Sequence, residues 1–167
     1  MEPDKLIQWL NWFYSLEQSQ VELYATQAKS AEDPYLAQAL ERFADIEQDH
    51  VDNIAAFIKN LGGKPTSLGD VVAPIVGKTL GTLLNLSNVN LMLKINIVLE
   101  NKAMSDYKDL IKKVETNSEL SSVLWANLLD EDLHSCWMER RLEKMEGELN
   151  RPVGEEEDSI GRKRKKV

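Results

Sequence analysis

Both histidines of this 167-residue chain follow a glutamate by three positions, in "IEQDH" and "DEDLH". Residues three apart lie on one face of an α-helix, so Glu47 with His50, and Glu131 with His134, would each present a carboxylate beside an imidazole. Carboxylate oxygens and imidazole nitrogens are donors that iron and manganese take in proteins. A zinc protease motif needs two histidines four apart on one helix, which the chain lacks. The spacing therefore predicts two halves of a metal site on two helices.

Two further glutamates, Glu17 and Glu100, fall in apolar stripes of helical spacing, and neither stripe contains a histidine. Four helices would thus each point one glutamate inward at mid-length. An ionised carboxylate in a protein interior costs several kcal/mol unless it is paired. No lysine or arginine lies in these stripes near the glutamates. Two divalent cations would balance four carboxylates, so the stripes predict a buried dinuclear metal site.

Four polar pairs recur along the chain at a nearly constant offset. A repeated helical hairpin would produce this pattern, and two hairpins related by a two-fold axis would place both halves around one centre. The pairs are Glu17 and Glu100, and Tyr24 and Tyr107, at an offset of 83, with Glu47 and Glu131, and His50 and His134, at an offset of 84.

Three more residues are candidates for orienting the site. Tyr24 and Tyr107 each lie seven residues after a glutamate of the set and share its helix face, so we expect them to hydrogen-bond carboxylates across the site. Buried tyrosines with only a packing role are the alternative. Asp130 is expected to hold the ring N–H of His50, with a solvated acid as the alternative.

The elements that must position these residues are four long helices. Pro3 at a first turn, Asp33-Pro34, Ser87 or Asn88, and Ser118 predict their starts, and the expected ends are near residues 30, 61, 115 and 149. We expect an all-α four-helix bundle over 1–149, made of two antiparallel hairpins joined by a long crossover (62–87) that contains a short helix. The charged segment 150–167 is expected to be a disordered tail.

Composition narrows the class of protein. Hydrophobic residues make up 43% and charged residues 29% of the chain, as in ordinary globular proteins. The net charge of −8 argues against a nucleic-acid partner, because phosphate would be repelled. The single cysteine, Cys136, cannot form an internal disulfide, which fits a cytoplasmic location. Cys136 is expected in the core, and Trp125 and Trp137 are expected to pack.

Four stretches, "SLEQSQVELYATQ", "ADIEQDHVDN", "VLENKAMSDYKDL" and "LLDEDLHSCW", resemble the ferritin-like di-iron carboxylate superfamily over residues 4–149. Within it the chain is most similar to demethoxyubiquinone hydroxylases and rubrerythrin-like domains. The resemblance implies a ferritin-like bundle with two iron ions, manganese being the alternative, and with bridging roles for Glu47 and Glu131. Where rubrerythrins carry a further glutamate, one turn after the third-helix ligand, this chain has Ala103. The metal ligands that the resemblance implies are Glu17, Glu47, His50, Glu100, Glu131 and His134.

The resemblance makes a di-iron oxidoreductase the leading expectation, with O₂ or peroxide and an electron donor as partners. The apolar stretch "APIVGKTLGTLLN" is similar to a hydroxylase segment that contacts membrane and quinone, which allows hydroxylation of a quinone-like ring and peripheral contact with the inner face of the membrane through 71–84. Ferritin-like iron storage or buffering is the second expectation, and a metal-free structural bundle is the third. A homodimer is also expected.

Overall fold

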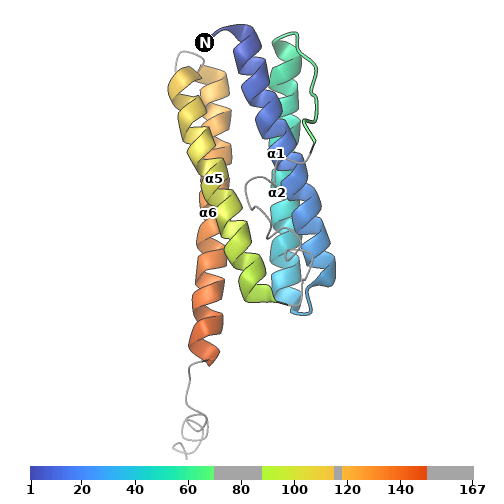
Figure 1. Cartoon of the computed structure of the whole chain (residues 1–167), viewed down its shortest axis with the longest axis vertical. Coiled ribbons are helices and arrows are strands. Elements are labelled where there is room, and N and C mark those ends of the chain that lie inside the picture. Colours follow the sequence, from blue (N-terminus) through green and yellow to red (C-terminus); the bar gives the residue numbers. More distant parts are fainter. Residues whose placement is uncertain (70–87, 115–117, 150–167) are drawn as a thin grey trace, which may run out of the picture.

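The computed structural model of the chain describes residues 1–69, 88–114 and 118–149, which contain four α-helices and no strand. The helices form two hairpins that stand side by side (Figure 1), and within them α1 packs along α2, and α5 along α6. The all-α bundle expected from the sequence is confirmed. The helices are α1 (Pro3–Ser30), α2 (Pro34–Asn60), α5 (Val89–Val114) and α6 (Ser118–Leu149).

The helix ends lie at capping residues of the sequence. The side chain of Asp33 accepts a hydrogen bond from the backbone N–H of Tyr35 (2.9 Å) at the start of α2, and Asn88 accepts one from Leu91 (3.0 Å) at the start of α5. α2 ends at Asn60, and Gly62, which follows the C-cap residue Leu61, has a positive φ of 79° that favours glycine. These local signals hold each helix in a fixed register, and register decides which side chains face inward.

Apolar side chains fill the bundle on both sides of its polar middle. One cluster is formed by side chains from the start of α1, the ends of α2 and α5, and the start of α6. It includes Leu10, Phe13 and Ile58. The second includes Leu40 and Met138 and lies toward the other ends of the helices. The predicted site residues lie at intermediate positions along each helix, so packing on both sides excludes water from them.

The outer face of α6 differs from the expectation. Trp125 is 55% exposed, Leu129 is 58% exposed and Leu133 is 56% exposed, and Cys136 is also exposed. The predictions that Trp125 packs and that Cys136 lies in the core are therefore wrong. One residue is about 100° of helical rotation, so Trp125 turns away from the buried Leu124 beside it. Trp137 does pack, in an edge contact with Phe43 at 5.5 Å between ring centroids.

The crossover is described only in its first part. Residues 64–69 run along α1, where the backbone N–H of Thr66 donates to Asn11 (2.7 Å) and that of Leu68 donates to Ser15 (2.8 Å). The predicted short helix, the segment 71–84 and the tail 150–167 lie outside the described residues. Within the described parts of the chain, none of the helices has the length and apolar character that a membrane crossing requires.

Candidate metal centre

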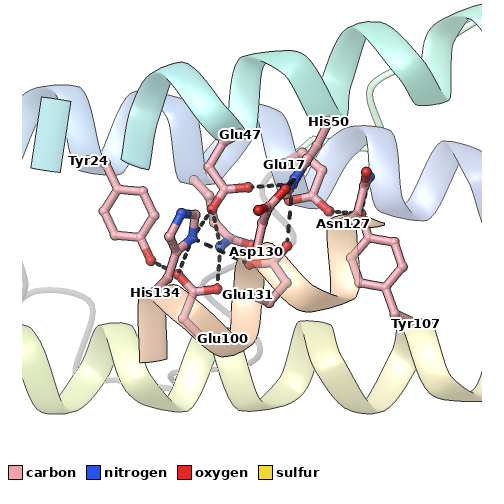
Figure 2. A network of polar contacts seen from close by, with 11 residues as sticks. Glu17, Tyr24, Glu47, His50, Glu100, Tyr107, Asn127, Asp130, Glu131 and His134 are labelled. Atoms are coloured by element: carbon pink, nitrogen blue, oxygen red, sulfur yellow. Dashed lines mark hydrogen bonds and ion pairs between the residues drawn. The ribbon is translucent and has the colours of Figure 1, made fainter. Parts of the chain in front are cut away.

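The six side chains predicted as ligands meet in the middle of the bundle. Figure 2 shows them converging from all four helices, and each is at most 2% exposed. Two groups of four can each place one ligand atom per residue within 4.8 Å of the others. Glu47 and Glu131 belong to both groups, which is the arrangement that two neighbouring cations with shared carboxylates need. The first group is Glu17, Glu47, His50 and Glu131, and the second is Glu47, Glu100, Glu131 and His134.

The two histidines direct the same ring atom at the carboxylates. His50 Nδ1 lies 3.0 Å from Glu47 Oε2 and 3.5 Å from Glu131 Oε1. His134 Nδ1 lies 3.2 Å from Glu47 Oε1 and 3.8 Å from Glu131 Oε2. The shared glutamates therefore each face both imidazoles. The outer nitrogens differ, because His50 Nε2 lies 3.2 Å from Asp130 Oδ2.

Two tyrosines hold the remaining glutamates from the opposite hairpin. Tyr24 of α1 donates its hydroxyl proton to Glu100 Oε1 on α5, and Tyr107 of α5 donates to Glu17 Oε1 on α1. Asn127 donates its side-chain N–H to the Tyr107 hydroxyl oxygen (3.1 Å). These reciprocal bonds, visible in Figure 2, join the hairpins across the site and fix one oxygen of each glutamate.

Burial dominates the electrostatics of the carboxyl groups. Desolvation raises the pKa of Glu17 and Glu100 well above the usual value, and the neighbouring Glu131 carboxylate raises both further. Burial would also raise the pKa of Glu131, but its contacts with Glu100 and the two histidines outweigh this and lower it. Without a cation, the surroundings therefore favour the protonated form of Glu17 and Glu100 and the charged form of Glu131.

The histidines hold protons in the absence of a cation. Burial alone would lower their pKa values, since it disfavours the charged imidazolium. The carboxylates of Glu131 and Glu47 outweigh burial and raise the pKa of His50 to about 12 and that of His134 to about 9. In the metal-free protein, the positive charge of each protonated ring takes the place of the charge of a metal ion. Metal binding must therefore displace these protons.

Unpartnered buried atoms show that the residues present fit a metal. Glu17 Oε2 and His134 Nε2 are buried and have no hydrogen-bond partner within the described part of the chain. The two Glu131 oxygens and His134 Nδ1 are also buried without a hydrogen bond there, and have only ion-pair contacts of 3.2 to 3.8 Å. Buried polar atoms without partners are costly, and a cation among them would satisfy several at once. A set of carboxylate and imidazole donors without thiolate fits iron.

Gln20 is a residue of this centre that the sequence reasoning passed over. Its side-chain Nε2 donates to Glu47 Oε1 (3.4 Å) and to Glu100 Oε2 (3.3 Å), and the side chain is fully buried. A signal was available, because Gln20 lies three residues after Glu17 and four before Tyr24, in the phase of the buried stripe.

A family model described as "Domain of unknown function (DUF892)" matches residues 2–148. Comparison with curated protein sequences finds no match. Among solved structures, the chain is similar to the bacterioferritin of Desulfovibrio desulfuricans, described with its diiron site in different catalytic states. The TM-score is 0.71 and the identity 22%, over 87% of this chain and 82% of that chain.

It is also similar to a bacterioferritin-related protein of Bacteroides fragilis, described as a dodecameric thioferritin. Here the TM-score is 0.70 and the identity 19%, over 90% of this chain and 94% of that chain. These likenesses establish a ferritin-like fold. The narrower kinship with hydroxylases or rubrerythrins stays a prediction from the sequence.

Proposed function

We propose that this chain, which belongs to the family described as a domain of unknown function (DUF892), binds a pair of iron ions and handles iron by oxidising Fe²⁺ with O₂ or peroxide. The observation that carries the proposal is the pair of four-residue groups with two shared glutamates, buried at the centre of the bundle. Two-metal sites hold small oxygen-containing molecules between the metals and stabilise their developing charge. Bound iron would supply the electrons, and the residues described below would bind the ions and orient the ligands.

Each protein group has a defined task in this proposal. The ligands would be Glu17 and His50 at one position and Glu100 and His134 at the other, with Glu47 and Glu131 shared. Tyr24 and Tyr107 fix one oxygen of each unshared glutamate, so the carboxylates need little rearrangement when a cation enters.

Burial of the centre keeps bulk water away from the reaction. The electrons and protons of the overall reaction balance as follows. Two Fe²⁺ ions give one electron each to peroxide, which takes up two protons and leaves two waters. With O₂, the same two electrons and two protons leave hydrogen peroxide. In either case the reaction needs a small oxidant that can enter the bundle, and it needs no organic substrate.

Iron storage or buffering is the form of iron handling that we favour. Both similar structures carry ferritin names, and one is described as dodecameric, which supports an assembly of this chain larger than a monomer. Oxidation of an organic substrate such as a quinone-like ring, with a separate electron donor, is the second candidate. Its membrane or quinone contact through 71–84 stays a prediction because that segment lies outside the described residues, and a cytoplasmic location stays one as well.

The test is anaerobic loading with Fe²⁺ followed by O₂ or peroxide. We expect about two ions bound per chain, as in dinuclear bundles, and a ferric absorption that develops faster than in protein-free solution. A Glu131→Ala variant should lose both properties, whereas Glu22→Ala, an exposed glutamate of the same bundle, should keep them. Iron retained well beyond two per chain in a large assembly supports storage. Protein that binds no iron, or that leaves the oxidation rate unchanged, contradicts the proposal.

A further inference from the structure

The internal repeat gives the six predicted ligands and the two tyrosines a counterpart in the other hairpin, but two further residues that contact ligands have no like counterpart. At an offset of 83, Gln20 corresponds to Ala103, although the flanking glutamates and tyrosines of these two helices correspond to one another. At an offset of 84, Ile46 corresponds to Asp130. Both mismatches lie at residues that contact, or would contact, a predicted ligand.

The first mismatch concerns the glutamates that are not shared. Glu100 has both oxygens held, one by the Tyr24 hydroxyl and the other by the Gln20 amide. Glu17 has one oxygen held by Tyr107, and its Oε2 makes no hydrogen bond within the described residues. Ala103 is buried but has no polar side-chain atom, so it cannot donate a hydrogen bond to Glu17 as Gln20 does to Glu100.

The second mismatch concerns the histidines. His50 has its outer nitrogen against Asp130, whose carboxylate fixes the orientation of the ring. The outer nitrogen of His134 is buried and makes no hydrogen bond in the described parts of the chain. Its surroundings are aromatic, with the Phe43 ring centroid at 4.2 Å from that of His134. An isoleucine at position 46 cannot offer an acceptor.

We propose that Gln20 is a further residue of the metal centre, a positioning residue that supports the His134 position through Glu100, while Asp130 supports the His50 position through the imidazole. The two metal positions are thus held by different means and are chemically unequal. This inference rests on the proposed function in one respect, that two ions bind at these residues.

The contacts predict that each support acts on one position. Glu100 belongs only to the group with His134, and His50 belongs only to the other group. Gln20 also donates to the shared Glu47, at a slightly longer distance, so a smaller effect on the His50 position is expected. Loss of such an outer partner typically lowers metal affinity about 10- to 100-fold.

The experiment measures Co²⁺ affinity by calorimetry and visible absorption in two single-position backgrounds. His50→Ala leaves the His134 position, and His134→Ala leaves the His50 position. We expect Gln20→Ala to weaken Co²⁺ binding about 10-fold or more in the His50→Ala background and much less in the other. Asp130→Asn should weaken binding only in the His134→Ala background.

A matched control is Gln27→Ala, which removes another buried amide of α1. Gln27 exchanges hydrogen bonds of 3.0 and 2.7 Å with Asn96, and within the described parts of the chain it has no hydrogen bond to a predicted ligand. It should lower thermal stability without changing Co²⁺ affinity in either background. Gln20→Leu, which keeps the side-chain bulk, replaces Gln20→Ala if circular dichroism shows that the alanine variant is unfolded.

Three results would overturn the inference: no effect of Gln20→Ala in the His50→Ala background, an equal effect in both, or an effect of the Gln27 control as large as that of Gln20→Ala. If either background variant binds no Co²⁺, the chain that retains both histidines is titrated with Co²⁺ instead. Gln20→Ala and Asp130→Asn must then weaken different binding steps. A wild-type chain that binds no pair of ions would instead refute the proposed function, so the two failures are distinguishable.

Discussion

Loading the centre with metal should release protons, and the minimum number follows from the histidines. At about pH 7 the metal-free rings of His50 and His134 are both protonated, because their pKa values lie near 12 and 9. A histidine must lose its proton from the ligating nitrogen before it binds metal. Glu17 and Glu100, whose pKa values are raised, add to the release to the extent that they hold protons. We therefore expect about two to four protons per pair of ions.

This release determines how affinity depends on pH. For two protons, the overall affinity for the pair of ions should fall about 100-fold for each pH unit of acidification, which is about 2.7 kcal/mol. The metal-free protein should respond in the opposite direction. Raised histidine pKa values give stability that is complete below the unfolded pKa and is lost as pH rises through the folded pKa, first that of His134 near 9. The raised carboxyl pKa values have the same sign. The difference in melting temperature between metal-loaded and chelator-treated protein should thus widen from about pH 6 to about pH 8.

Calorimetry in two buffers of different ionisation enthalpy counts the protons directly. The heat of Co²⁺ binding should change with the buffer in proportion to the protons released, and the His134→Ala variant should release about one fewer. Release of fewer than about two protons by the wild-type chain, or an affinity that does not change with pH, would refute the electrostatic reasoning.

Elemental analysis should find about one ion per chain in Glu17→Ala, because this variant leaves one group of four intact. It should find almost none in Glu131→Ala, because that variant removes a shared ligand. Equal loss in both variants would contradict the division into two groups. Tyr107→Phe removes the hydroxyl that donates to the buried Glu17 and accepts from Asn127. It should lower the free energy of unfolding of the metal-free protein by about 1–3 kcal/mol in urea titration, because buried polar groups lose their partner. An unchanged value would mean that this bond adds no net stability. Gly63→Ala should lower the melting temperature because the added carbon would lie 3.1 Å from side-chain and backbone atoms, at a cost of about 1–3 kcal/mol. Gly147→Ala, where the added carbon meets no atom within 4 Å, should instead stabilise α6 by up to about 1 kcal/mol.

Much of the architecture could be read from local patterns. Asp33 and Asn88 cap their helices as expected, because capping depends on residues only two or three positions away. The phases of Glu47, Glu100 and Glu131 placed them inward correctly, since an apolar stripe identifies the buried face of a helix. Phase also agrees with the exposure of Cys136, which lies opposite the stripe of α6, and the wrong expectation of a core position came from its residue type alone.

The sequence by itself determined which helix face each ligand candidate occupies, because helical periodicity is a local property of the backbone. Only the tertiary structure decided which partners those residues meet. Tyr24 could have bonded any nearby acceptor, and its reach to Glu100 depends on how the two hairpins are set against each other. The place of Gln20 between Glu47 and Glu100 depends on the same packing of three helices. Contacts between residues 27 and 80 positions apart are set by helix–helix packing, and no pattern within one helix encodes them.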